Sequence, residues 1–117
     1  MNNFVTKHEH NDQISICFNI EADEVMAVGE KMEAINEEAY MNGYNWEAFL
    51  TRYLLTSHKE ILNGLETDSE AGTYVALYNK TDADKANKLV EIIQVLLNSP
   101  DKIYAYLKEN GAEIEWN

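Results

Sequence analysis

Between Asp12 and Ile20 the chain alternates between apolar and polar residues. Ile14, Ile16, Phe18 and Ile20 fall on one side of this segment, with Ser15, Cys17 and Asn19 on the other. A period of two residues is typical of a strand with one buried face. We therefore predict a strand here, and we expect residues 3–8 to pair with it across a polar turn at residues 8–12.

The period changes to that of a helix after Asp23. Up to Met41 the apolar side chains cluster on one side of a helix, at Val25, Val28, Met32, Ile35 and Ala39. Asn42-Gly43 ends this pattern, and Asn45 is expected to cap a second helix. The second helix has a buried stripe made of Trp46, Phe49, Leu50, Tyr53 and Leu54. One further helical turn is predicted at Lys59–Asn63, closed by Gly64.

The second half of the chain predicts a hairpin, two helices and a last strand. The hairpin joins Leu65–Asp68 to Thr73–Tyr78 through a loop that contains Gly72. Thr81 and Asp84 resemble a capping box in front of a helix with a broad apolar side, formed by Ala86, Leu89, Val90, Ile92, Ile93, Val95, Leu96 and Leu97. Ser99-Pro100 starts the next helix, because proline is well tolerated in a first turn. Asn110-Gly111 ends it, and the alternation from Ala112 to Trp116 predicts a closing strand.

The predicted element order is β(β)ααββααβ. This order indicates an α+β fold, with a mainly antiparallel sheet and helices packed on one face. At 117 residues the chain has the length of one domain, and we expect residues 1–117 to form it.

Composition excludes two classes of partner. Nine Lys and Arg against 21 Asp and Glu give a net charge of −12 and a sequence pI near 4.5. Proteins that bind nucleic acid through phosphates, or anionic membranes through their headgroups, need a basic surface instead. The start of the chain is too polar for a signal peptide, and no apolar run is long enough to span a membrane. With the single cysteine, Cys17, these features predict a cytoplasmic protein without disulfides.

No motif for catalysis or nucleotide binding is present, and we expect a protein that is not an enzyme and uses no cofactor or metal. His8 and His10 would share one face of a strand, but two imidazoles without a third ligand make a weak metal site. His58 follows Ser57 in the sequence, but this adjacency does not indicate a catalytic triad, because the fold brings triad residues together from separate positions. A lone cysteine such as Cys17 most often packs as a small hydrophobe.

The negative charge is concentrated in three segments. Residues 21–41 contain seven acidic residues against Lys31 alone, and Glu66, Asp68 and Glu70 add three negative charges. The third segment contributes Glu109, Glu113 and Glu115, while the remaining positions hold eight acidic and eight basic residues. The excess charge is therefore local, and its location matters more than its total.

The first predicted helix would display carboxylates beside apolar side chains. Glu30, Glu33 and Glu37 point away from its buried side at 100° per residue. Met26, Tyr40 and Met41 are expected on the same outer side. Interfaces use both kinds of residue, whereas a solvated face needs only the carboxylates. A partner surface and a plain solvated face are about equally well supported here.

The hairpin and the closing strand extend this hypothesis. Tyr74 and Tyr78 lie on one side of their strand and Val75 and Leu77 on the other. If the aliphatic residues face the helices, both tyrosines lie on an open sheet face; the alternative places the tyrosines in the core. The candidate partner-binding residues are Met26, Glu30, Glu33, Glu37, Tyr40, Glu66, Asp68, Tyr74, Tyr78, Glu113 and Glu115.

Three stretches resemble a family of bacterial immunity proteins. Their marks are Tyr-x-Trp-Glu after an Asn-Gly turn (residues 44–47), Leu-x-x-Asp-x-Glu-Ala-Gly (residues 65–72) and a closing Glu-Ile-Glu-Trp (residues 113–116). The chain resembles immunity protein family fifty-one of the polymorphic toxin and contact-dependent growth inhibition systems, over roughly its last two-thirds. This resemblance implies a small, non-enzymatic cytoplasmic inhibitor of a toxin domain, and it carries over no binding residues.

The resulting hypothesis is an acidic immunity protein that neutralises a cognate toxin C-terminal domain, expected to be a basic nuclease. Neither nucleic acid nor membrane is expected as a partner. Two alternatives stay open: a small metal-dependent enzyme that uses His8, His10 and carboxylates, and a generic acidic adaptor without a toxin.

Overall fold

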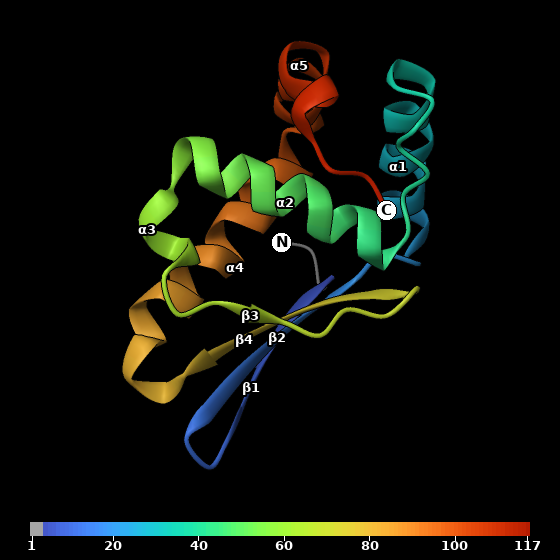
Figure 1. Cartoon of the computed structure of the whole chain (residues 1–117). Coiled ribbons are helices and arrows are strands. Elements are labelled where there is room, and N and C mark those ends of the chain that lie inside the picture. The colour runs from blue at the N-terminus through green and yellow to red at the C-terminus, as the bar shows by residue number, and fades with distance from the viewer. Residues whose placement is uncertain (1–3) are drawn as a thin grey trace.

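The computed structural model describes residues 4–117 as two layers, a sheet and a set of helices (Figure 1). In chain order the elements are β1 (Val5–His10), β2 (Gln13–Asn19), α1 (Asp23–Ile35), α2 (Gly43–Ser57), α3 (Lys59–Leu62), β3 (Glu66–Thr67), β4 (Thr73–Asn79), η1 (Lys80–Asp82), α4 (Ala83–Asn98), α5 (Pro100–Asn110) and η2 (Gly111–Glu113). The predicted α+β class is confirmed.

The sheet has the strand order β1-β2-β4-β3, and every neighbouring pair is antiparallel. The β1–β2 turn is tighter than the predicted one, because it contains only Asn11 and Asp12 between paired His10 and Gln13. Asn11 adopts a φ of 55°, which asparagine tolerates better than most residues. The predicted first strand began at Asn3, which lies outside the described residues.

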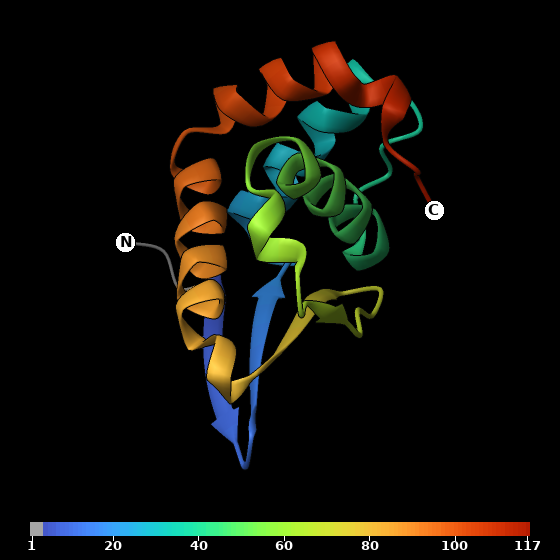
Figure 2. The ribbon, with the colours of Figure 1, turned by 60° about the vertical axis from the view of Figure 1, so that its left-hand side comes forward.

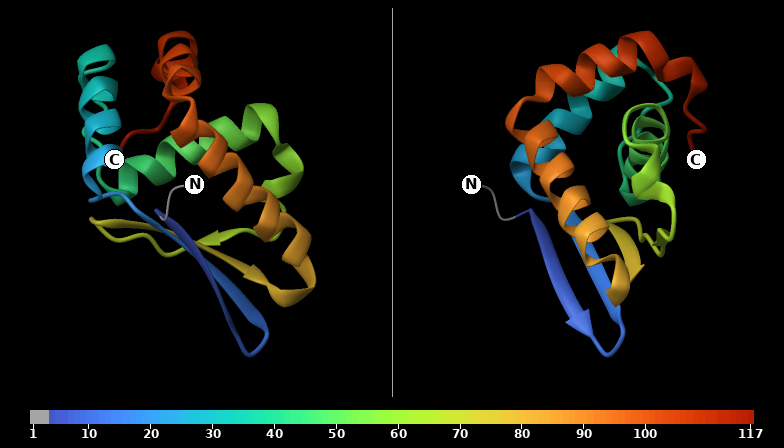
Figure 3. Two further views of the ribbon diagram at one scale, coloured as in Figure 1. Left: turned by 180° about the vertical axis from the view of Figure 1, so that it is seen from behind. Right: turned by 90° about the vertical axis from the view of Figure 1, so that its left-hand side faces the viewer.

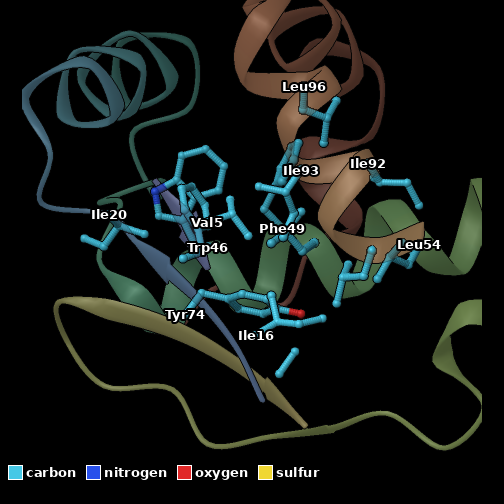
Figure 4. Close-up of a cluster of buried hydrophobic side chains, with 14 of the residues drawn as sticks. Val5, Ile16, Ile20, Trp46, Phe49, Leu54, Tyr74, Ile92, Ile93 and Leu96 are labelled. Carbon is cyan, nitrogen blue, oxygen red and sulfur yellow. The ribbon is translucent and has the colours of Figure 1, made fainter. Parts of the chain in front are cut away.

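Strand register places both β4 tyrosines in the core. Tyr74 pairs with Phe18 and Tyr78 with Ile14, and residues directly opposite in an antiparallel pair share a face. Phe18 and Ile14 are buried beneath the helices, so the tyrosines are buried with them, at 1% exposure each. Figure 4 shows Tyr74 lying between the sheet and the helices. The prediction of tyrosines on an open sheet face is therefore wrong, and the alternative arrangement holds.

The helices cover one face of the sheet (Figure 2). α2 contacts β4, and α4 contacts β1, β2 and β4, while α5 packs against α1. In Figure 3 α5 runs across the end of the helical layer farthest from the sheet. Trp46 joins the layers, because its ring lies 5.1 Å from that of Phe18 and 5.9 Å from that of Phe49. No helix within residues 4–117 has the length and apolar character needed to cross a membrane.

The first helix is shorter than predicted. α1 ends at Ile35, because Asn36 adopts an extended conformation and its side-chain oxygen accepts a hydrogen bond from the backbone N–H of Glu38, at 2.9 Å. An asparagine side chain that bonds two residues ahead competes with the helical pattern. Residues 36–42 consequently form a loop, although Ala39 is fully buried as expected.

Helix starts also differ from the predictions in detail. α2 begins at Gly43 and is capped by Asn42, not by Asn45, since the Asn42 side chain accepts from the Asn45 N–H at 2.9 Å. Thr81 does not cap α4; it lies in the preceding η1 turn. Pro100 occupies the first turn of α5 as predicted, without a side-chain cap from Ser99.

The predicted closing strand is absent from the sheet. Residues after Asn110 form η2 and then an extended segment that lies against the helices, with Ile114 buried and Trp116 half-buried. The predicted alternation is seen only from Glu113 to Trp116, because Ala112 is exposed as well and residues 111–113 form the η2 turn. From Ile114 onward the burial alternates because the segment packs one side against the helices.

Candidate partner-binding surface

Asn45 joins three separate segments at the start of α2. It is the one buried polar residue among those described, at 1% exposure. Its side-chain nitrogen donates to the Tyr40 carbonyl oxygen at 2.7 Å, and its side-chain oxygen accepts from the Asn117 backbone N–H at 2.6 Å. The loop after α1 and the C-terminal segment are therefore both fixed to α2.

The tip of the β3–β4 hairpin is held at the same place. The Gly43 N–H donates to the Ala71 carbonyl oxygen at 2.7 Å. A Cβ atom on Gly43 would lie 1.8 Å from the Glu70 carbonyl oxygen, so the approach requires glycine. In Figure 1 the hairpin tip, the loop after α1 and the C-terminal segment all approach this end of α2.

A groove of about 540 Å³ lies between the outer side of α2 and the C-terminal segment. One wall is a helical stripe made of Tyr44, Glu47, Ala48, Thr51, Arg52 and Leu55, and the other contains Glu113, Glu115, Trp116 and Asn117. Tyr44 and Leu55 are 41% and 39% exposed, which makes them two of the five exposed large hydrophobic residues among the described positions. The apolar surface of this groove thus lies among carboxylates.

Carboxylates outnumber bases in the groove. Arg52 is its one basic residue, and it is engaged within the protein. Its Nε donates to the Glu113 carbonyl oxygen at 3.1 Å, and its guanidinium lies 3.8 Å from the Glu113 carboxylate. Within residues 4–117, Glu47 and Glu115 form no ion pair within 4.0 Å. The groove therefore presents unneutralised negative charge.

Trp116, which lines the groove, carries an unpaired hydrogen-bond donor. Its indole nitrogen is buried, and no hydrogen-bond acceptor within the described part of the chain reaches it. Buried donors nearly always have a partner, and an unpaired one costs about 1–3 kcal/mol. The indole N–H is thus a donor for which residues 4–117 supply no acceptor.

The structure leaves nine of the predicted partner-binding residues exposed: Met26, Glu30, Glu33, Glu37, Tyr40, Glu66, Asp68, Glu113 and Glu115. Tyr74 and Tyr78 are buried. Burial is the main cause that raises the pKa of each tyrosine. Negative charge on Tyr78 and Glu47 raises the pKa of Tyr74 further, and negative charge on Asp82 does the same for Tyr78. Both are protonated core residues at neutral pH.

The three acidic segments come together only in part. Glu113 and Glu115 line the groove, and the loop with Glu37 and Tyr40 is tied to the same end of α2 through Asn45. Glu66 instead lines a separate pocket beside His10 and Asp12 at the β1–β2 turn. Glu30 and Glu33 lie on the exposed side of α1.

The hypothetical histidine site gains no support. His8 and His10 are exposed on β1, and no group of three or more His, Cys, Asp or Glu in residues 4–117 is arranged to hold a metal ion. Cys17 is half-buried on the sheet face that carries no helix.

The model of the family described as Immunity protein 51 matches residues 4–112, and the chain belongs to this family. This membership identifies an immunity protein, and it implies a cognate toxin as partner. The match reaches further toward the N-terminus than the predicted two-thirds, and it ends before the Glu-Ile-Glu-Trp segment. Neither the curated proteins nor the solved structures compared with the chain give a significant match.

Sequence reasoning missed most of the groove. Tyr44, Leu55 and Trp116 were not among the predicted contact residues, although the sequence contains a signal for the first two. Spaced eleven residues apart, they share one side of α2, opposite the buried stripe with Trp46. An apolar pair on the solvent side of an amphipathic helix is the pattern that would have identified them.

Proposed function

We propose that this protein binds a cognate toxin domain in the cytoplasm, that this domain is a basic nuclease, and that binding blocks its activity without catalysis. The family membership carries the toxin-binding part of the proposal. The net charge of −12 supports a basic toxin, because a nuclease presents positive charge to nucleic acid phosphates. Carboxylates on the inhibitor would compete for that surface.

The exposed acidic residues on α1 fit a role in steering. Glu30 and Glu33 lie on α1, and Glu37 follows in the loop. Glu30 and Glu33 are three residues apart on α1, a helical spacing at which like charges repel, and a basic partner relieves that repulsion. Charges at the edge of an interface mainly speed association, and salt screens their effect.

The direct test uses the C-terminal domain of the protein encoded immediately upstream of this chain, which we expect to be the cognate toxin. We expect the two to copurify, and we expect one equivalent of the immunity protein to abolish cleavage of plasmid DNA or total RNA by the toxin. A toxin domain that binds but cleaves no nucleic acid would refute the nuclease part alone. Failure of the two proteins to associate would refute the function.

Charge reversal tests the electrostatic part. In Glu30→Lys/Glu33→Lys/Glu37→Lys the association rate should fall at least tenfold at 50 mM NaCl, with a much smaller change in dissociation. Stopped-flow fluorescence at 50 and 500 mM NaCl measures both rates. The isosteric Glu30→Gln/Glu33→Gln/Glu37→Gln should show an intermediate loss. An association rate that does not respond to salt or to either variant would contradict steering by these residues.

A further inference from the structure

We propose that the groove between α2 and the C-terminal segment is the centre of the partner interface, and that it receives a basic segment with an apolar side chain between Lys or Arg residues. This inference rests on the proposed function, since the segment would belong to the toxin domain. It goes beyond that function because it assigns the residues that hold the partner.

The shape of the groove fits a segment of polypeptide. Its α2 wall runs from Tyr44 to Leu55, and the eleven steps between these twelve residues span roughly 16 Å at 1.5 Å per residue. Three turns of a partner helix, or a loop of similar length, match this distance. The C-terminal segment forms the opposite wall, so the groove is lined on both sides along its length.

The apolar content of the groove supplies an anchor site. Tyr44 and Leu55 offer aromatic and aliphatic surface on the α2 wall, and Trp116 adds aromatic surface on the opposite wall. Interface centres are enriched in aromatic residues, and they bury an apolar side chain from the partner. The three side chains come from two segments that Asn45 holds together.

Charge decides the chemistry of the partner. Glu47 and Glu115 have no basic partner within residues 4–117, and the guanidinium of Arg52 lies beside the carboxylate of Glu113. A neutral or acidic segment would bury these carboxylates uncompensated, at a high desolvation cost. A segment with Lys or Arg beside its apolar anchor pairs with them.

The indole N–H of Trp116 is an independent sign of a missing partner. It is a buried donor without an acceptor in the described residues, and the residue that carries it lines the groove. A backbone carbonyl of the bound segment would satisfy it after a small displacement of the side chain. The indole proton also gives a resolved NMR signal, which makes it a reporter for occupancy of the groove.

The first arm of the test needs no toxin. An amphipathic helical peptide of about twelve residues, made of Leu and Lys, matches the groove in length and charge. In NMR titration we expect it to shift the Trp116 indole signal and the amides of residues 44–55. A peptide with Glu in place of Lys should cause no shift. Shifts confined to another surface, or none with the basic peptide, would overturn the proposed groove.

The second arm compares two double variants for binding to the same upstream-encoded domain. Leu55→Ala/Glu115→Lys alters the groove, whereas Val95→Ala/Glu91→Lys makes the same kinds of change at exposed positions of α4, outside the groove and outside the predicted partner-binding residues. We expect the groove variant to lose at least 100-fold in affinity, mostly through faster dissociation, and the control to lose less than fivefold. Circular dichroism of both variants establishes that they fold.

The outcomes separate the two proposals. If the toxin binds the groove variant as tightly as the wild type, the groove proposal is wrong and the proposed function stands. If the basic peptide occupies the groove but the toxin domain does not bind the wild type, the groove is a site for basic segments and the proposed function is wrong.

Discussion

A single amide side chain decides how the surface around α2 is assembled. Asn45 is buried where it can reach the loop after α1 on one side and Asn117 on the other. An apolar residue of similar size would fill the space without holding either segment. The position therefore uses a donor and an acceptor on separate atoms of one short side chain, an arrangement that the amide of asparagine provides and a single hydroxyl does not.

Asn45→Ala should lower the free energy of unfolding by about 1–3 kcal/mol, because two side-chain hydrogen bonds are lost and their partners are left partly buried. Urea denaturation measures the loss, and hydrogen exchange should show faster exchange at the Asn117 amide. Asn63→Ala, at an exposed position, is the control and should change stability by less than about 0.5 kcal/mol. Unchanged protection of Asn117 would show that other contacts hold the C-terminal segment.

At the scale of elements, β4 carries titratable groups into the core. The Tyr78 hydroxyl donates to the Ile61 carbonyl oxygen at 2.6 Å, and Tyr74 lies beneath α2. Burial and nearby negative charge raise the pKa of both phenols above their ordinary value. Ionisation of either would place a charge between the sheet and the helices.

Stability should fall in alkaline solution for this reason. The unfolded tyrosines titrate near pH 10, whereas the folded ones keep their protons to higher pH. Below about pH 10 the tyrosines are protonated in both states, and their contribution to the free energy of unfolding is complete. Above about pH 10 the unfolded state loses these protons first, so the free energy of unfolding falls by about 1.4 kcal/mol per pH unit for each of the two tyrosines. Urea denaturation between pH 8 and 11 measures the slope. Tyr78→Phe should lower it by about half, and an identical slope in this variant would contradict the assignment.

Most elements could be predicted from periodicity, but their ends and faces could not. The β2 alternation and the broad apolar side of α4 reflect burial directly, so they identify elements reliably. The face of β4 is ambiguous, because Tyr74, Ala76 and Tyr78 alternate with Val75 and Leu77, and both sets can be buried. Only pairing with Phe18 and Ile14 decides between them, and register is not a local property of the sequence.

At the scale of the whole molecule, electrostatic repulsion opposes folding. Residues 4–117 contain four ion pairs, all at the surface, where such pairs contribute little. A net charge of −12 on a compact chain of radius of gyration 13.4 Å is self-repulsive. Stability is therefore expected to depend on salt through screening of repulsion and not through loss of ion pairs.

Raising NaCl from 20 to 200 mM should stabilise the fold by about 1 kcal/mol, or roughly 4 °C in Tm, because the Debye length shortens to below the molecular radius. Calorimetry measures the shift. Glu30→Gln/Glu33→Gln/Glu37→Gln should have a higher Tm at 20 mM and a smaller response to salt. A Tm that falls as salt is added would mean that attractive pairs dominate.

Only the charged residues of the candidate site could be predicted from the sequence. Clustered carboxylates such as Glu113 and Glu115 can be counted in a sequence, and both line the groove. The groove itself requires a segment near residue 116 to lie along residues 44–55. That contact depends on a hydrogen bond across 72 positions, between Asn45 and Asn117, for which local patterns contain no signal.

The hydrogen bonds at the start of α2 have a consequence for binding. Loops and chain ends normally lose conformational entropy when a partner orders them, and this loss weakens the complex. Here the loop after α1, the hairpin tip and the C-terminal segment are already held to α2 through Asn45 and Gly43. Folding has already met that entropic cost, so more of the contact energy remains available to hold the toxin once it arrives.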